Sequence, residues 1–192
     1  MREIEGLPTD TSKFLFSFIG YSDIASLIRS GKLKIAPFVP ESLSCDKIDL
    51  RINDEFVRLK KTTKVFNIKT KKNYSIFFEH EKNSEIVIYP NERVLMCTIE
   101  KLQLPTDIIG IVGLKSTFSR LGLQANMGLI DPGFSGRLTL EVLGSSFPIC
   151  LYAGESIFHV AFASLKPAAT QGYMGKYRNQ NGPTLPRFHC DR

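Results

Sequence analysis

The sequence of 192 residues contains no tryptophan, three histidines and four cysteines, so residue types that bind metals are few. No two cysteines form a CxxC pair, and neither a disulfide framework nor a zinc site is indicated. Buried or idle thiols are the expectation for all four, which are Cys45, Cys97, Cys150 and Cys190. A disulfide-stabilised scaffold and a zinc-dependent protein are therefore both disfavoured.

Long apolar runs are missing as well. Residues 14–19 form an apolar stretch far too short to span a bilayer, and Glu3, Glu5 and Asp10 stand where a secretory leader would be basic. A chain of this length with 43% hydrophobic content suits one domain with a sizeable core. We expect a cytoplasmic protein with no membrane partner.

The charge is mildly basic. The chain has 25 lysines and arginines against 19 aspartates and glutamates, a net charge of +6 and a pI near 9.2. The lysines cluster only modestly, in "RLKKTTK" and "IKTKKN", and no basic helix studded with aromatic residues accompanies them. We therefore expect solvated hairpin loops and no nucleic-acid partner. A small polyanion such as a nucleotide triphosphate would suit the same charge.

Short segments in which apolar and polar residues alternate predict β-strands. They are "KIDLRIND", "EIVIYP", "RVLMCTIEKLQL", "RLTLEVL", "ICLYAG" and "SIFHVAFASL", separated by Pro, Gly, Asn or Asp. One short N-terminal helix is expected in "DIASLIRSG", with Ser22 as its cap and Gly31 at its end. Strands at this spacing favour a mainly β fold, an antiparallel barrel or jelly roll.

The composition changes after Lys166 and Pro167. Residues 171–192 are rich in glycine, polar and basic residues and carry few periodic apolar ones. We expect a β domain over residues 1–170, followed by a mobile or draped tail over residues 171–192.

The window 113–143 holds the residues best suited to chemistry. In "RLTLEVL" a period of two puts Leu138, Leu140 and Val142 on one face and Glu141 on the other, facing solvent or a cavity. Just upstream, "IDPGFSG" is a turn that lifts Asp131 out of the sheet, where Gly133 and Gly136 allow a close backbone approach.

A second turn in this window, "KSTFSR", combines cationic and hydroxyl side chains with backbone amides. Such a turn can cradle a phosphate, although a Ser/Thr-rich turn often only satisfies its own backbone. It supplies Lys115, Ser116, Thr117, Ser119 and Arg120.

Six stretches, in this order, resemble the dCTP deaminase branch of the dUTPase superfamily. They are "YSDIASLIRSGKLKIAPF", "IDLRINDEF", "IYPNERVLMCTIEKLQLPTDIIGIV", "LKSTFSRLGL", "IDPGFSGRLTLE" and "KYRNQNGPTLPR". The resemblance implies a homotrimer of distorted jelly rolls of the dUTPase type with active sites at subunit interfaces. It also implies hydrolytic deamination of dCTP to dUTP without zinc.

The family's functional residues can be matched to this chain. Its catalytic glutamate falls on Glu141, the serine and arginine of its first motif on Ser116 and Arg120, and the aspartate that contacts the deoxyribose on Asp131. The full set that we expect to contact the substrate, including tail residues that close over the triphosphate, is Lys115, Ser116, Thr117, Phe118, Ser119, Arg120, Asp131, Thr139, Leu140, Glu141, Tyr173, Lys176 and Gln180.

These side chains suit a metal-independent deamination. Glu141 can take a proton from a water beside C4 of cytosine and later deliver one to the departing amine. Ser116 can hold the water or the developing oxyanion, and Arg120 can orient Glu141. No CxxC with a His-x-Glu partner is present for the zinc-dependent route. Magnesium is expected to arrive on the triphosphate and to keep several waters, without a protein cage.

Three features depart from the family's pattern. Lys115 replaces the usual arginine, which keeps the charge and loses the bidentate fork. The segment 124–130 is shorter than the hairpin with which the family helps to form its pyrimidine pocket. His159 stands where a glutamine is often found, and a lone histidine on a strand is usually structural.

Two other functions stay open. A dUTP diphosphatase, or an enzyme with both activities, would use Asp131 to activate water toward the α-phosphate. Glu141 favours deamination, because plain dUTPases need no carboxylate there, whereas the short segment 124–130 is compatible with dUTP. The more distant alternative is a non-catalytic nucleotide-binding regulator. It is disfavoured by the presence of Ser116, Arg120, Asp131 and Glu141.

Overall fold

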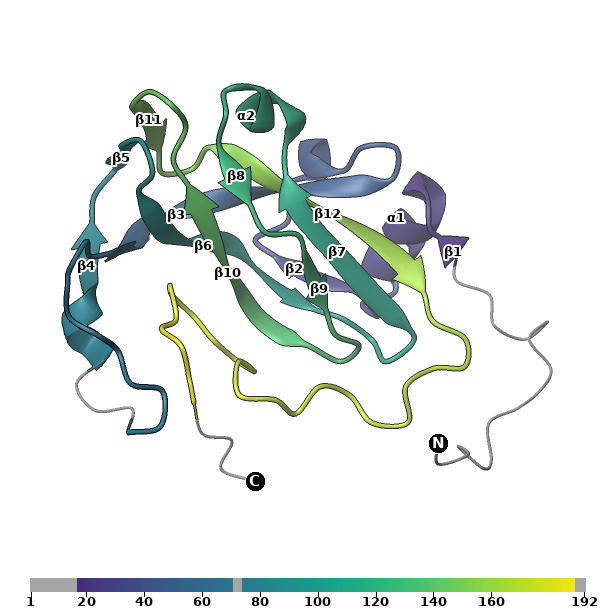
Figure 1. Ribbon diagram of the computed structural model, residues 1–192. Helices are drawn as coiled ribbons and strands as arrows, with labels where there is room; N and C mark the ends of the chain where they lie inside the picture. Colours follow the sequence, from purple (N-terminus) through teal and green to yellow (C-terminus); the bar gives the residue numbers. More distant parts are fainter. Residues whose placement is uncertain (1–16, 71–73, 189–192) are drawn as a thin grey trace, which may run out of the picture.

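The computed structural model describes residues 17–70 and 74–188 and shows a mainly β protein (Figure 1). The acidic N-terminal positions named above, the end of "IKTKKN" and Cys190 lie outside the described residues. Within them the strands are β1 (Ser17–Phe18), β2 (Lys34–Ala36), β3 (Lys47–Leu59), β4 (Phe78–Lys82), β5 (Glu85–Ile88), β6 (Arg93–Gln103), β7 (Ile108–Leu114), β8 (Gln124–Ala125), β9 (Gly128–Ile130), β10 (Ser135–Leu143), β11 (Ile149–Tyr152) and β12 (Ser156–Ser164).

Most of these strands form one curled antiparallel sheet. Its order is β8-β10-β6-β3-β12-β7-β9, with β1 beside β12, β2 beside β6 and β4 beside β3. β5 and β11 form a separate two-stranded ribbon. Each segment predicted from alternation is a strand, and the mainly β expectation is confirmed. In β10 burial alternates along the whole strand, which confirms that Leu138, Leu140 and Val142 face the core.

The segment 124–130 joins the two edges of the curled sheet. β8 pairs with β10 at one edge, and β9 pairs with β7 at the other. The sequence suggested only a short loop here. Two short strands form instead, because a chain that crosses between two open edges can satisfy backbone N–H and C=O groups of both.

The described residues contain two α-helices, one more than predicted. α1 (Tyr21–Arg29) is the expected helix, and Gly31 adopts φ +71° just after it. Ser22 does not cap it: Gly20 holds the N-cap position, and no side chain bonds there. α2 (Ser116–Arg120) forms where we predicted a turn, and a single helical turn satisfies the same local backbone groups.

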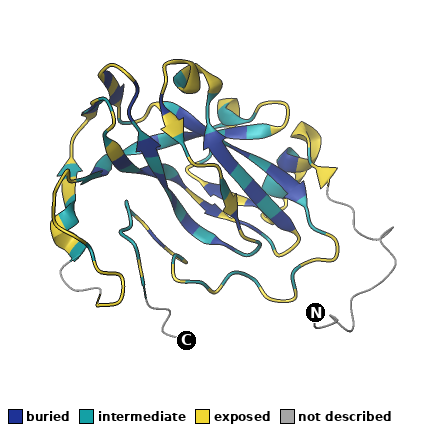
Figure 2. Ribbon diagram, viewed as in Figure 1, coloured by how far each residue is buried: buried dark blue, intermediate teal, exposed yellow. Residues whose placement is uncertain are grey.

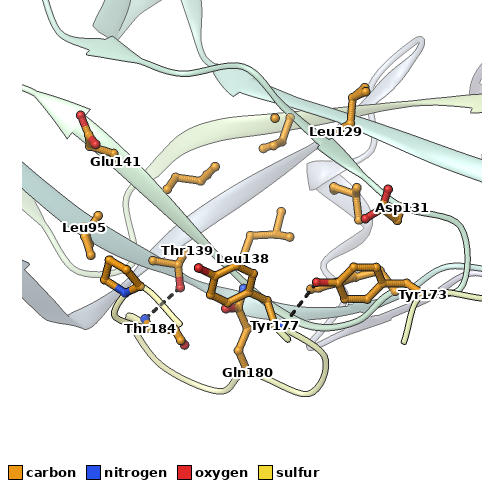
Figure 3. A pocket seen from close by; sticks show the side chains of 16 residues that line it. Leu95, Leu129, Asp131, Leu138, Thr139, Glu141, Tyr173, Tyr177, Gln180 and Thr184 are labelled. Carbon is orange, nitrogen blue, oxygen red and sulfur yellow. Dashed lines mark hydrogen bonds between the residues drawn. The ribbon is translucent and has the colours of Figure 1, made fainter. Parts of the chain in front are cut away.

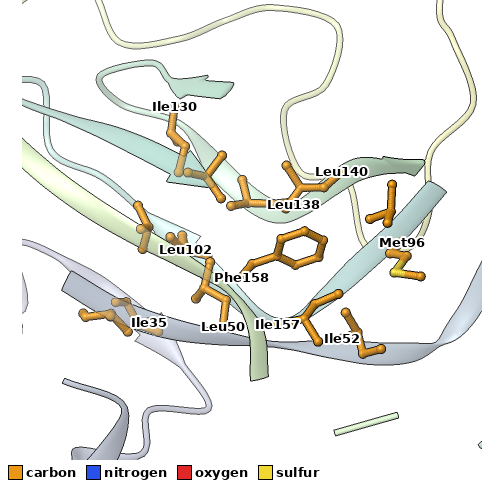
Figure 4. Packing of buried hydrophobic residues seen from close by; sticks show 14 of the residues in the cluster. Ile35, Leu50, Ile52, Met96, Leu102, Ile130, Leu138, Leu140, Ile157 and Phe158 are labelled. Carbon is orange, nitrogen blue, oxygen red and sulfur yellow. The ribbon is translucent and has the colours of Figure 1, made fainter. Parts of the chain in front are cut away.

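A continuous apolar core fills the curl of the sheet (Figures 2 and 4). Phe56, Phe158 and Phe162 are its largest fully buried side chains. Removing one such ring typically lowers the free energy of unfolding by about 3–5 kcal/mol. Cys97 is also buried, and burial raises the pKa of its thiol to about 12, in keeping with an idle cysteine.

The tail follows β12 and runs along the outside of the sheet without helix or strand as far as Phe188 (Figure 1). It covers the free edge of β10: the Asn179 N–H donates to the Ser135 carbonyl, and the Arg137 N–H donates to the Gln180 carbonyl. The tail is therefore draped. Over the described ranges, no helix has the length and apolar character needed to cross a membrane.

Candidate active site

A pocket of about 430 Å³ lies between β10, β9 and the tail (Figure 3). Leucines and other apolar side chains, such as Leu95, Leu129 and Leu138, line it together with a few polar groups. The predicted residues on its wall are Asp131, Thr139, Leu140, Glu141, Tyr173 and Gln180. An apolar hollow with a few convergent polar groups is the usual form of a small-molecule site.

Glu141 lies on the outward face of β10, at one end of this pocket (Figure 3). Its carboxylate accepts a hydrogen bond from the Arg93 guanidinium and forms an ion pair with it. Arg93 begins β6, which runs antiparallel to β10 and brings the two residues together. Within one chain Glu141 is thus oriented by Arg93, and not by the Arg120 that the sequence suggested.

Asp131 lies toward the other end of the pocket, in the turn between β9 and β10 (Figure 3). Its carboxylate is exposed. The glycines of this turn allow the predicted close backbone approach, and the segment that approaches is the tail: a Cβ on Gly133, which has φ +76°, would lie 2.5 Å from the Gly172 Cα. A Cβ on Gly136 would lie 3.1 Å from the Gln180 backbone N.

Thr139 and Gln180 fasten the tail to the middle of β10. The Thr139 hydroxyl donates to the Gly182 carbonyl at 3.2 Å and accepts from the Thr184 N–H at 3.1 Å. The Gln180 side chain is buried, and its Nε2 donates to the Arg137 carbonyl at 2.7 Å. In this arrangement Gln180 holds the tail in place, and its amide nitrogen is already engaged.

Two tyrosines of the tail, Tyr173 and Tyr177, also line the pocket. The Tyr173 ring packs on Phe134 with centroids 5.8 Å apart, and its hydroxyl accepts from the Tyr177 N–H at 3.2 Å. The Lys176 ammonium lies 5.2 Å from the centre of the Tyr177 ring and does not line the pocket. The predicted tail residues are therefore near one another, with two of the three on the pocket wall.

The residues of α2 do not reach this pocket in the same chain. Ser116, Thr117, Ser119 and Arg120 are exposed, while Phe118 packs partly against the core. Among the described residues, no hydrogen-bond or ion-pair partner is found for the Ser116 and Thr117 hydroxyls or the Arg120 guanidinium. Figure 1 shows α2 beyond the β8 end of β10, on the side away from the tail.

Lys115 has a partner of its own. Its ammonium pairs with Asp49 on β3 and lies 3.5 Å from the Ser156 hydroxyl. His159 follows on the same face, since β12 pairs it with Asp49 on one side and Gly113 on the other. Its pKa is lowered, first by burial and then by the nearby Lys47 ammonium. Among the described residues, the His159 imidazole has no hydrogen-bond partner.

Sequence reasoning missed Arg93, Tyr177 and Thr184. Arg93 could have been found only from the register of β6 against β10, which no local pattern encodes. Tyr177 and Thr184 stand within the quoted tail motif, but their direction depends on how the tail packs. In the described ranges, no cluster of three or more His, Cys, Asp or Glu side chains could hold a metal ion.

Comparisons with known proteins identify the family of this chain. Residues 18–165 match the family described as dCTP deaminase-like. A dCTP deaminase of Acidianus ambivalens is 39% identical, over 88% of this chain and 97% of its own length. A protein of Sulfolobus islandicus rod-shaped virus 1, named "Probable deoxyuridine 5'-triphosphate nucleotidohydrolase", is 38% identical, over 86% of this chain and 95% of its own length.

The fold is also found among solved structures. The 2'-deoxycytidine 5'-triphosphate deaminase from Agrobacterium tumefaciens superposes with a TM-score of 0.62 at 21% identity, over 78% of this chain. Only 48% of that longer chain is covered, so this match carries the fold alone. The family match covers most of the chain and the curated relatives match over nearly their full length. The chain belongs to the dCTP deaminase-like family.

Proposed function

We propose that this protein hydrolyses dCTP to dUTP and ammonia without zinc. The observation that carries this proposal is the carboxylate of Glu141 on the wall of a largely apolar pocket, held by Arg93. A fixed carboxylate beside an apolar hollow is what a general base for water needs. The relative from Acidianus ambivalens carries the same activity in its name.

In the proposed reaction Glu141 accepts a proton from a water molecule while the water oxygen forms a bond to C4 of cytosine. The carboxylic acid then returns the proton to the exocyclic nitrogen, the C4–N bond breaks, and ammonia leaves. The remaining hydroxyl proton moves from the C4 oxygen to N3, which gives uracil. One group serves as base and acid, which contributes about a hundredfold to ten-thousandfold to the rate. Ser116 would hold the water or the developing oxyanion, and Asp131 would contact the deoxyribose.

The proposed enzyme is a homotrimer in which α2 of one subunit completes the pocket of another. The exposed hydroxyls of Ser116 and Thr117 and the Arg120 guanidinium support this, since their own chain gives them no partner among the described residues. Met127 and Leu129, which lie on the segment 124–130, are 77% and 73% exposed and provide apolar surface for a neighbouring subunit. Symmetric closure of this kind is common in soluble oligomers.

Magnesium would enter this site as part of the substrate, bound to the triphosphate. The polar groups of the pocket wall include only two carboxylates, Asp131 and Glu141, at its two ends (Figure 3). This donor set fits an ion that keeps most of its waters better than an ion held in a protein cage. Lys176 and the α2 cations would then neutralise the phosphates.

The experiment that tests the proposed function is incubation of the purified protein with Mg·dCTP and with Mg·dUTP in separate reactions. We expect ammonia and dUTP from dCTP, and no pyrophosphate from either nucleotide. Ammonia absent from the dCTP reaction, at a protein concentration that gives the intact oligomer, contradicts the deaminase assignment. Nucleotide binding without any product would favour the non-catalytic regulator.

A dUTP diphosphatase activity, alone or beside deamination, is the second candidate. The exposed carboxylate of Asp131 favours it, because such a group can activate water toward the α-phosphate. The name of the viral relative points the same way. Pyrophosphate and dUMP from the Mg·dUTP reaction would support this candidate, and their absence would exclude it.

A further inference from the structure

A group of aromatic residues lies outside the main core, on the connection from β3 to β4 and at the first residue of β4. We call it the β3–β4 aromatic cluster; its members are Phe66, Tyr74, Phe77 and Phe78. Phe66 contacts Phe77 edge-on with centroids 5.8 Å apart and Tyr74 at 6.5 Å, and Tyr74 contacts Phe78 at 6.3 Å. None of the four belongs to the continuous apolar core. Their common partner must therefore lie elsewhere.

That partner is the far end of the tail. The Phe188 ring lies 5.3 Å from the Phe66 ring in a tilted arrangement and 5.8 Å from the Tyr74 ring in an edge-on one. Pro186 lines the same apolar hollow of about 300 Å³ together with the cluster. Edge-on and offset ring pairs at these distances are specific contacts that contribute beyond the area they bury.

The residues just before Phe188 form part of the nucleotide pocket. Thr184 and Pro186 line that pocket, so Pro186 belongs to both hollows. Within the described chain, residues 185–187 form polar bonds only through Arg187. The Arg187 guanidinium donates to the Lys176 carbonyl, and the Arg187 N–H donates to the Tyr177 hydroxyl at 3.3 Å, both within the tail itself. The aromatic contacts of Phe188 thus tie this end of the tail to the β domain.

We propose that the β3–β4 aromatic cluster is a docking site for the chain's own tail, with Phe188 as a latch that holds Thr184 and Pro186 against the nucleotide pocket. Phe188 is a positioning residue, because it acts through the tail. This inference rests on the proposed function in one respect: it takes the pocket to be the nucleotide-binding site. A segment held in its binding conformation loses less entropy on binding, so the latch favours nucleotide affinity.

The test is hydrogen–deuterium exchange of the tail amides in the full-length protein without nucleotide. In Phe188→Ala, amides of residues 180–184 should exchange roughly threefold to tenfold faster, the factor that one or two ring contacts supply. Phe66→Ala should give a similar increase, and the double variant should add little to either. Phe147→Ala, at a half-exposed phenylalanine between β10 and β11, is the matched control and should leave these amides unchanged.

Kinetics give the second readout. Phe188→Ala should raise KM for dCTP by a similar factor with little change in kcat, and Phe188→Tyr should restore both KM and the slow exchange. Unchanged tail exchange in Phe188→Ala, or full additivity with Phe66→Ala, would overturn the latch. Exchange needs no turnover, so the two proposals can fail separately. Faster exchange in a protein without deaminase activity would retain the latch and reject the function.

Discussion

The two halves of the predicted site differ in how completely one chain builds them. The β10 half, which comprises Asp131, Thr139, Glu141 and the tail, forms a pocket, and the side chains of Thr139 and Glu141 have partners within the chain. The α2 half, residues 115–120, presents its hydroxyls and its arginine to solvent. This contrast does not mean that α2 itself is poorly packed.

The base of α2 is in fact well anchored. The Lys115 N–H donates to the Ile157 carbonyl at 2.8 Å, the Lys115 ammonium pairs with Asp49, and Phe118 packs against the core. A well-packed element whose outer side chains, here Ser116, Thr117 and Arg120, lack partners among the described residues is what we expect of a group that serves a neighbouring subunit. Variants in one half, or variants combined between subunits, therefore test this difference.

The largest expected effect is on the β10 half. Glu141→Gln keeps the size of the side chain but cannot accept the proton of water, so ammonia release from dCTP should fall by at least about a hundredfold. Nucleotide affinity should change far less, because phosphate and sugar contacts come from other residues. Ammonia release and equilibrium binding of dCTP measure the two effects.

The control for this variant is Glu79→Gln on β4, an exposed strand glutamate far from the pocket lining. It should keep wild-type activity. Near-native ammonia release by Glu141→Gln would show that the carboxylate only pairs with Arg93 and that the proposed mechanism is wrong.

Asp131→Asn tests the other end of the same pocket. In an enzyme that only deaminates, it should weaken nucleotide binding by about tenfold, the typical loss of one charge-assisted hydrogen bond. In a bifunctional enzyme it should abolish pyrophosphate release and leave some ammonia production. Measuring ammonia and pyrophosphate in the same samples separates the two outcomes.

Mixing two inactive variants tests whether the halves belong to different subunits. Arg120→Met and Glu141→Gln should each be nearly inactive alone. If a site combines α2 of one subunit with β10 of another, random mixed trimers restore about one site in four. The mixture, unfolded and refolded together, should therefore regain about a quarter of wild-type activity. No recovery, with mixed oligomers verified by mass spectrometry, would place both halves of the site in one subunit.

Local patterns and long-range contacts differ in how far the sequence predicts them. The strands were predictable because alternation such as that of Leu138, Leu140 and Val142 reflects burial on one face. A close backbone approach was predictable from Gly133, since few other residues allow it, but the sequence did not show that the tail is the segment that approaches. The family and its fold followed from motifs whose order is specific.

Long-range pairing was not predictable in this way. The contact of Arg93 with Glu141 depends on the register of β6 against β10, and that of Phe188 with Phe66 on how the tail crosses the sheet. Both contacts join residues far apart in the chain, where a single sequence carries no local signal. The two short strands of the segment 124–130 were missed for the same reason, because each pairs with a different edge.

The smallest expected effect concerns His159, beside the anchor of α2. Burial, and then Lys47, lower its folded-state pKa, while Asp49 and Asp46 oppose this and Lys115 adds to it. A lowered folded pKa means that the unfolded chain binds the proton more readily. The free energy of unfolding should therefore fall as the pH drops below about 6.5, the ordinary histidine value, and on through the lower folded pKa.

His159→Gln should lose less stability over this range, because glutamine does not titrate. Urea unfolding at pH 8 and pH 5, at one fixed protein concentration, measures both proteins. An equal loss of stability in the two proteins would show that groups other than His159 determine the stability at acid pH. It would also show that His159 does not affect the stability of the face that anchors α2.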